Sequence, residues 1–445
     1  MTTQLGPARV CLDFGTSFSK AALFAPASTI AEAARPLALG AAAGADTAWL
    51  APSVLFVDEG RIFVGPPALA RARAPGRRRA DPIVSFKTIF AARDLEAALA
   101  LKTPASIDPT RTLSFRDAVV IYLAHLDRLV RAALTREGLE PLAQAPRRYT
   151  TPIWRTRDDA DRIIGRLFDE AIVVSAKLAD ALIGAEGVSI AQTKAVLADA
   201  HAQAGAGALE TSVFEAHAAA AAYAAFAPQT PRFFLLLDMG AGTTDIAGFE
   251  RIERDGEILM SELRPARQSC GLAGDEIDQI IVNLAAAKRS PRDAEAAHAH
   301  WRALRLGARA AKRELFAAGR AQLTTPHASI TVTRDELMRS APYKALQAAL
   351  AAIIEPSVTE VSRQAGVANA EAPVILMAGG GANTPLLKDA LIAAAHKAGL
   401  QNKLKIERVG EDWRLPLSAD PDLKSLMPQL AIALGGALVD VRADA

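Results

Sequence analysis

Apolar positions along the first half of the chain follow strand spacing and helix spacing in turn. Two apolar runs separated by a short polar turn predict a hairpin near the start. Further on, apolar residues at helical spacing follow Ser114, a candidate N-cap. A later strand is expected to stop at Pro152. The pattern predicts strands at 9–14, 18–24, 53–57, 61–64 and 147–154, a helix at 114–136, and helical stretches over 158–204 that break near 184–187.

The same layout starts again near residue 231. It predicts strands at 233–238, 245–250, 257–263, 329–333 and 373–377, and helices at 275–287, 292–318, 335–364 and 386–398. A hairpin followed by alternating helices and strands, present twice, indicates an α/β protein with two similar halves, as an internal duplication would produce.

Composition narrows the class of protein. A chain of 445 residues with 51% hydrophobic residues is long enough for roughly two or three folded lobes. The net charge of +2 gives no reason to expect nucleic acid or a membrane surface as a partner. Two cysteines make no disulfide framework, and no signal peptide or long apolar run is present. We therefore expect a cytoplasmic protein with neither a nucleic-acid nor a membrane partner.

Two turns in the sequence contain the residues that are candidates for ligand binding. Each begins with an acid at a strand end, Asp13 in DFGTS and Asp238 in DMGAGTTD, and continues with glycines and hydroxyl residues. Glycine lets successive backbone N–H groups point inward and form an anion nest. An acid beside a bound phosphate needs a cation between them, which suggests Mg²⁺ held through water. Either turn alone is equally compatible with a plain hairpin. Together they predict a phosphate chain held from two sides, with a nucleotide in a cleft between the lobes.

A third glycine segment follows the apolar strand predicted at 373–377. The sequence VILMAGGGANTP runs from this strand through Gly379, Gly380 and Gly381 toward a helix. A helix N-terminus after glycines suits an anion or the close approach of a ring and ribose.

These motifs together resemble the superfamily of actin, the sugar kinases and the heat-shock ATPases. Within it, they most resemble the ATPase region of the heat shock protein 70 (DnaK-type) family. The supporting stretches are APSVLFVDEGRIFVGPPA, YTTPIW, VFEAHAAAAAYAAF, GLAGDEIDQIIVN and RAAKREL, and the resemblance runs from about Val10 to Asp440. It implies an actin-like ATPase fold with two ribonuclease-H-like lobes. Lobe I would comprise residues 1–228, with a final helix at about 424–445 packing back on it, and lobe II would comprise residues 229–423.

The resemblance also implies a role for individual residues in binding ATP or ADP with Mg²⁺. Asp13 and Asp238 match the acids that hold magnesium waters. The catalytic positions are Lys87, Glu215, Asp245 and Thr243. The nucleotide-binding positions are Gly15, Thr16 and Ser17 in the first phosphate loop, Gly240, Ala241, Gly242, Thr243 and Thr244 in the second, and Gly274, Lys312, Arg313, Gly379, Gly380, Gly381 and Asn383.

Several positions depart from the family pattern. Ala216 and His217 replace a proline and a threonine, and Gly381 and Asn383 replace a serine and an arginine. Arg309 stands where the adenosine helix has a glutamate, and a serine of that helix falls on or beside Phe316. These changes bear on adenine binding more than on phosphate binding. A helical insertion between residues 158 and 207 has no counterpart in the family.

The matches lead to one expected function and to several alternative functions. The chain stops after the closing helix of the ATPase region, so we expect no intrinsic peptide-binding domain and an unknown protein partner that reads the nucleotide state. The first hypothesis is a slow ATPase that acts as a conformational switch. The alternatives are a weakly hydrolysing or non-hydrolysing nucleotide-binding scaffold, an actin-like polymerising ATPase, and a sugar or acetate kinase.

Overall fold

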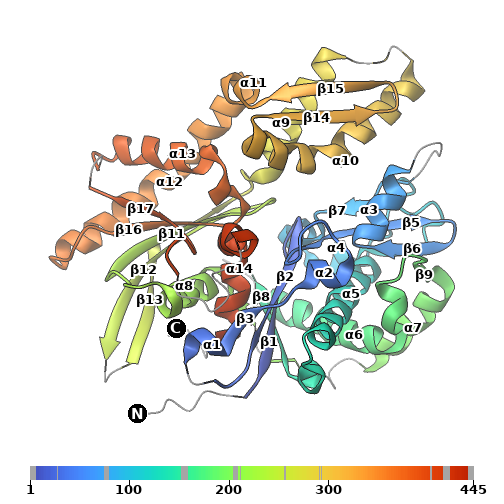
Figure 1. The fold of residues 1–445 in the computed structure, drawn as a ribbon, viewed down its shortest axis with the longest axis horizontal. Coiled ribbons are helices and arrows are strands. Elements are labelled where there is room, and N and C mark those ends of the chain that lie inside the picture. Colours follow the sequence, from blue (N-terminus) through green and yellow to red (C-terminus); the bar gives the residue numbers. More distant parts are fainter. Residues whose placement is uncertain are drawn as a thin grey trace. The chain divides into compact units, whose positions relative to one another are not determined.

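A computed structural model describes the chain as two compact units. Unit 1 comprises Met1–Gln229 and Gly410–Ala445, and unit 2 comprises Thr230–Val409 (Figure 1). The residues that the structure describes are 7–27, 29–74, 80–151, 159–203, 209–210, 212–254, 257–289, 291, 293–400, 403–413 and 421–438. Pro152 and the two ends of the expected insertion, at 158 and at 204–207, lie outside the described residues.

The central sheet of unit 1 has the strand order β10-β8-β1-β2-β3. β2 pairs antiparallel with both β1 and β3, whereas β8 runs parallel to β1 and β10 runs parallel to β8. The strands are β1 (Arg9–Asp13), β2 (Phe18–Phe24), β3 (Ala34–Pro36), β4 (Ala51–Pro52), which also pairs with β2, β8 (Arg147–Thr151) and β10 (Val213–Phe214).

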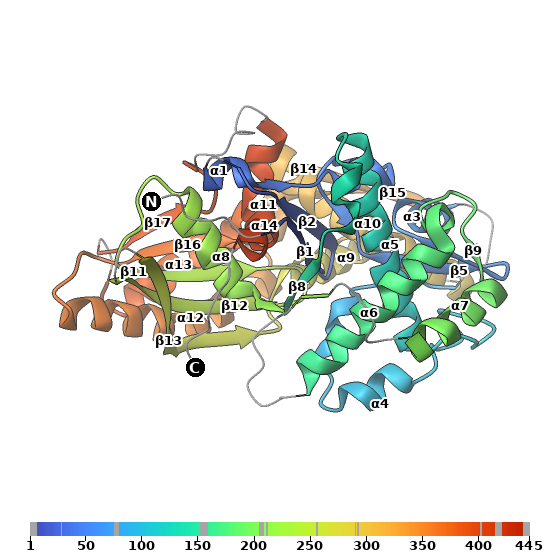
Figure 2. The same cartoon turned by 90° about the horizontal axis from the view of Figure 1, so that it is seen from below.

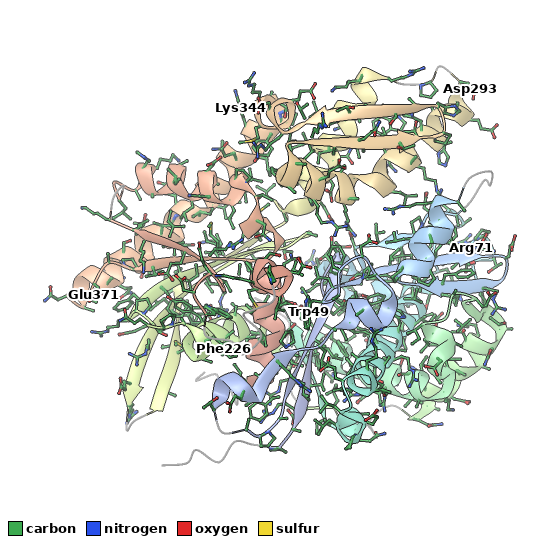
Figure 3. All side chains as sticks on the ribbon, in the orientation of Figure 1. Trp49, Arg71, Phe226, Asp293, Lys344 and Glu371 are labelled. Atoms are coloured by element: carbon green, nitrogen blue, oxygen red, sulfur yellow. The ribbon has the colours of Figure 1, made fainter. Side chains whose placement is uncertain are left out.

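Helices cover both faces of this sheet. Val10 and Leu12 of β1 belong to a core built with α5 (Phe115–Arg136) and α6 (Ala160–Leu178). Cys11 points to the opposite face, because side chains alternate along a strand, and there it meets α14 (Pro421–Leu438), which packs on α8 (Glu215–Phe226). Phe226, labelled in Figure 3, stacks on Trp413 with 5.6 Å between ring centroids. The C-terminal segment is therefore built into unit 1.

The predicted N-cap of the long helix is confirmed. Ser114 accepts a hydrogen bond from the N–H of Asp117, and the Asp117 side chain accepts one from the N–H of Ser114. This reciprocal arrangement is a capping box, and it satisfies two backbone donors at the helix start. It fixes the first turn of α5.

The remaining elements of unit 1 include a second sheet of order β7-β5-β6-β9. The expected helical stretch over 158–204 is divided into α6, a 3₁₀ turn, β9 and α7. The elements are α1 (Ile30–Ala33), α2 (Leu39–Ala43), β5 (Val54–Asp58), β6 (Arg61–Val64), α3 (Pro66–Arg73), β7 (Ile83–Val84), η1 (Phe86–Ala91), α4 (Leu95–Ala100), η2 (Glu140–Gln144), η3 (Ala179–Leu182), β9 (Val188–Ser189) and α7 (Ile190–Gln203).

Unit 2 contains a sheet of order β13-β12-β11-β16-β17 (Figure 2). β12 pairs antiparallel with β11 and β13, while β16 runs parallel to β11 and β17 runs parallel to β16. The strands are β11 (Phe233–Met239), β12 (Thr244–Arg254), β13 (Glu257–Cys270), β16 (Val374–Ala378) and β17 (Lys405–Arg408). In both units the first three strands of the sheet form an antiparallel meander, and two parallel strands follow beside the first. The fold is therefore α/β with two ribonuclease-H-like sheets, as the sequence predicts.

The helices of unit 2 complete its core. α12 packs on β11, β12 and β13 and against α13, and α9 and α10 pack together beside a two-stranded hairpin. The elements are α9 (Gly274–Lys288), α10 (Ala294–Ala318), β14 (Arg320–Thr325), β15 (Ala328–Thr333), α11 (Arg334–Arg339), α12 (Ala341–Val367), η4 (Gly380–Asn383) and α13 (Pro385–Lys397). In the described part of the chain, every helix is too short or too polar to cross a membrane.

Candidate functional site

The first glycine turn joins β1 to β2 in unit 1. A Cβ atom on Gly15 would lie 2.1 Å from the carbonyl oxygen of Phe18, so the turn closes this tightly only with glycine. Within the described residues, the backbone N–H groups of Thr16 and Ser17 make no hydrogen bond. Buried or half-buried N–H groups without partners are unusual in a folded protein and fit a bound anion.

The second glycine turn joins β11 to β12 in unit 2, and α9 holds its carbonyl groups. The N–H of Gly274 donates to the oxygen of Gly240 at 3.1 Å, and the N–H of Asp275 donates to the oxygen of Ala241 at 2.7 Å. As far as the structure describes the chain, the N–H groups of Ala241 and Gly242 have no hydrogen-bond partner. This turn therefore resembles the first in having two consecutive N–H groups without a partner among the described residues.

The acid at the end of β1 is paired with a lysine that the sequence analysis missed. Lys20 on β2 lies opposite Asp13 in the strand register and donates to its Oδ2 at 2.6 Å. Thr150 on β8 approaches Asp13 Oδ1 at 3.4 Å. In unit 2, the position opposite Asp238 is occupied by Asp245 instead. An alignment of the two turns, which places Lys20 and Asp245 each seven residues after the first acid, would have found this residue.

The two acids differ in how well they fit a hydrated Mg²⁺. Lys20 already neutralises Asp13, which is 1% exposed. Asp238 is 9% exposed and lies at a strand end beside a glycine turn, a position that suits a cation held through water. Among the described residues, no three His, Cys, Asp or Glu side chains are grouped as direct metal ligands. The residues therefore fit a hydrated Mg²⁺ at Asp238, whereas Lys20 supplies the positive charge at Asp13.

The predicted catalytic residues form one pair in each unit. In unit 1, Lys87 of η1 makes an ion pair with Glu215 at the start of α8, and their side chains are 14% and 8% exposed. In unit 2, Asp245 accepts hydrogen bonds from Thr243 Oγ1 at 2.9 Å and from Ser269 Oγ at 2.6 Å. Ser269 lies on β13 and is a second residue that the sequence analysis missed.

The third glycine segment lies beside the second turn, because β16 runs parallel to β11. Gly379 has a φ of 73°, and a Cβ atom there would lie 2.3 Å from Asp238 Oδ1. The sequence analysis expects the glycines to lead toward a helix. The structure places the 3₁₀ turn η4 between Gly379 and α13, and Asn383 in η4 accepts a hydrogen bond from Arg408 at 2.9 Å. Gly379 therefore lies close against the acid of the second turn and the backbone of Met239.

A charged cluster joins α10 to the start of α9. Lys312 donates to the carbonyl oxygen of Gly274 at 2.7 Å and lies 3.0 Å from Asp278 Oδ1. Arg309 approaches Asp275 at 3.3 Å and Asp278 at 3.8 Å. Burial raises the pKa of Asp278 above its usual value, although Lys312 and Arg309 oppose that rise. Arg313 is exposed. Among the expected nucleotide-binding residues, Lys312 and Gly274 meet in this cluster.

A comparison with protein families gives one match. Residues 190–403 match the family model described as Hsp70 protein. This segment includes Glu215, the second glycine turn, the Lys312 cluster and the third glycine segment. None of the curated proteins compared with the chain matches it.

Proposed function

Since residues 190–403 match the Hsp70 family model, we propose that the chain is a chaperone-like ATPase that binds ATP with Mg²⁺ and hydrolyses it slowly. The observation that carries this proposal is the occurrence, in each unit, of a glycine turn beside a strand-end acid, with N–H groups that have no partner among the described residues. A protein partner that reads the nucleotide state is part of the proposal. The family match supports the ATPase, and the geometry of the turns supports phosphate as its ligand.

Phosphate binding would use backbone donors and one lysine. The N–H groups of Thr16 and Ser17 in unit 1, and of Ala241 and Gly242 in unit 2, are available to donate to phosphate oxygens. Lys20 offsets the charge of Asp13, so this acid does not repel the ligand. Asp238 is the residue that would hold a hydrated Mg²⁺, which supplies positive charge to the phosphates when bound.

Hydrolysis would use the two catalytic pairs. A water oxygen bonds to the terminal phosphorus while the bond from that phosphorus to the bridging oxygen breaks, which gives ADP and phosphate. Lys87, oriented by Glu215, stabilises the negative charge that develops on the phosphoryl oxygens. Asp245, held by Thr243 and Ser269, accepts a hydrogen bond from the attacking water and receives its proton.

Calorimetric titration with ADP and ATP in the presence of Mg²⁺ tests binding. We expect saturation with a Kd below about 1 mM, and a loss of at least about tenfold in affinity for Asp238→Asn. Lys397→Met, which breaks an exposed ion pair with Glu355 elsewhere in unit 2, is the control and should bind as the natural chain does. Absence of saturation at millimolar nucleotide would contradict the proposal.

A nucleotide-binding scaffold with little or no hydrolysis is the second candidate. It is favoured by Arg309, which pairs with Asp275 and Asp278 at a position where the family has a glutamate. Phosphate release followed over hours at saturating ATP separates the two functions. A slow release that stops in Lys87→Met supports the ATPase, and binding without release supports the scaffold.

A further inference from the structure

Three buried hydroxyl groups lie directly beneath the first glycine turn. Tyr122 of α5 lies with its hydroxyl oxygen 2.9 Å from Ser19 Oγ and 3.0 Å from Ser53 Oγ, and the two serine oxygens are 3.2 Å apart. The three residues are 0%, 0% and 1% exposed. They come from three separate parts of unit 1: helix α5, strand β2 and the residue between β4 and β5.

Ser53 holds two carbonyl groups of the turn. Its Oγ donates to the oxygen of Gly15 at 2.8 Å, and its backbone N–H donates to the oxygen of Ser17 at 2.9 Å. The carbonyl of Gly15 and the N–H of Thr16 belong to one trans peptide, so they point in opposite directions. Because Ser53 draws the carbonyl inward, the N–H of Thr16 must point away from the core. This explains why that N–H group has no partner within the described chain.

Tyr122 fixes Ser53. The Ser53 hydroxyl donates its single proton to Gly15, so it can only accept from Tyr122. Burial raises the pKa of Tyr122 to about 12, which keeps its hydroxyl protonated as a donor near neutral pH. Tyr122 has one proton and two serine acceptors, so Ser53 accepts either directly from Tyr122 or from Ser19, which Tyr122 then supports. In both cases the Ser53 proton goes to Gly15.

The ring of Tyr122 contacts the segment that carries Lys87. It stacks on Phe86, the residue before Lys87, with 5.0 Å between ring centroids. It also lies against Phe14 of the glycine turn at 5.4 Å, and Phe14 packs edge-on against Phe90 of η1 at 5.7 Å. The hydroxyl and the ring of Tyr122 thus reach two different parts of the proposed site, which are the turn and η1.

We propose that Ser53 and Tyr122 are positioning residues for the phosphates of the nucleotide. Ser53 orients the Thr16 peptide toward the ligand, and Tyr122 fixes both Ser53 and η1. This inference rests on the proposed function for its ligand, but the orientation of the turn can be measured without one.

Three single variants distinguish a positioning role in nucleotide binding from a contribution to folding stability alone. Ser53→Ala and Tyr122→Phe remove successive hydroxyls of the network and keep the aromatic packing. Thr103→Val is the matched control, because Thr103 is equally buried in unit 1 and donates to the carbonyl oxygen of Leu113 at 3.1 Å away from the turn. We expect Ser53→Ala to weaken ADP binding about tenfold, because it removes the hydrogen bond to the Gly15 carbonyl itself. Tyr122→Phe should weaken it about threefold, because it removes only the hydroxyl that supports Ser53. Thr103→Val should leave the affinity unchanged despite a similar loss of stability.

A double variant and hydrogen exchange complete the test. Ser53→Ala with Tyr122→Phe should bind ADP about as weakly as Ser53→Ala alone, because both changes break the same network.

Without nucleotide, amide exchange in residues 14–18 should speed up in both single variants and stay unchanged in Thr103→Val. If exchange in the turn is unchanged in both variants, or if the control weakens ADP binding equally, the inference is wrong. If the natural chain binds no nucleotide, the proposed function fails, and the exchange result alone decides whether Ser53 and Tyr122 orient the turn.

Discussion

Lys20 and Asp13 face each other across the first hairpin, with 2.6 Å between Lys20 Nζ and Asp13 Oδ2. In the second hairpin, the same register position pairs Asp238 with Asp245. The two hairpins share the turn geometry but differ in charge, because one has a cation where the other has an acid. The acid of the first turn therefore has a lysine as its cross-strand neighbour, whereas the acid of the second turn has another acid there.

Removing the Lys20 charge should destabilise unit 1 measurably. The Lys20 and Asp13 side chains are 11% and 1% exposed, so Lys20→Met leaves a buried carboxylate without its cation. Breaking a buried ion pair from one side costs about 3 kcal/mol or more. The free energy of unfolding, measured in urea, should fall by about this amount. Asp13→Asn added to Lys20→Met should restore most of the loss, because no charge is then left unpaired.

The control for this experiment is Lys177→Met in the same unit. Lys177 pairs with Asp199 at 2.8 Å, but their side chains are 34% and 61% exposed. Exposed pairs contribute about 0–1 kcal/mol. Equal losses for Lys20→Met and Lys177→Met would show that the Asp13 pair contributes no more than an exposed one.

Breaking the Lys87–Glu215 pair should stop hydrolysis but not binding. Lys87→Met removes the cation that would stabilise charge on the phosphoryl group, and such losses reduce rates by about 100-fold to 1,000-fold. ADP affinity should stay within about threefold, because the partnerless N–H groups of the turns are intact. Phosphate release at saturating ATP and ADP titration measure the two effects. Lys194→Met, which breaks a pair with Asp117 at the start of α5, is the control and should keep the natural rate.

Local sequence patterns predicted the elements of the fold well. The two glycine turns are visible because their acids, glycines and hydroxyls are consecutive in the chain. The N-cap at Ser114 is visible because the capping residue directly precedes the apolar helix pattern. The break near 184–187 is visible because of its glycines, but β9 was not predicted, because the apolar spacing stays helical on both sides of it.

Contacts between distant residues could not be predicted from local patterns. Ser53 and Tyr122 are 69 residues apart, and both look like ordinary strand-end and helix residues until the fold brings them together. Lys87 and Glu215 are 128 residues apart, and only the family resemblance suggested them. Lys20 is the exception. The duplication of the hairpin marks its position, because Lys20 and Asp245 occupy equivalent places in the two hairpins.

Gly379 should not tolerate a side chain. Gly379→Ala would place a Cβ atom 2.3 Å from Asp238 Oδ1 and 2.4 Å from the carbonyl oxygen of Met239 at a positive φ of 73°, so both the carboxylate and the backbone of the second turn must move. Gly399→Ala is the matched control, because its φ is 68° and no atom lies within 4 Å of the added Cβ. Gly399→Ala should cost about 1 kcal/mol of strain in a urea titration. Gly379→Ala should cost clearly more and should also weaken ADP binding in Mg²⁺ at least about tenfold. Equal losses of stability and unchanged ADP binding would contradict the contact with Asp238.

Unit 1 should lose stability in mild acid because of His125. This side chain is 1% exposed, and its Nδ1 donates to the carbonyl oxygen of Leu182 at 2.8 Å. Burial lowers its pKa to about 4, against an ordinary value of about 6.5. The unfolded chain therefore takes up a proton at a higher pH than the folded one does. The stabilising contribution is complete above about pH 6.5 and falls as the pH drops toward 4, by about 3 kcal/mol in total.

Urea titrations between about pH 4.5 and pH 7 measure this contribution. His125→Asn keeps a donor near Leu182 and has no titrating ring, so the fall in stability over this range should be smaller by about 2–3 kcal/mol. His201→Asn is the control, because His201 lies on the surface of unit 1 with its side chain 56% exposed, and it should keep most of the natural slope. If His125→Asn shows the same fall with pH as the natural chain, His125 is not the group that is protonated on unfolding.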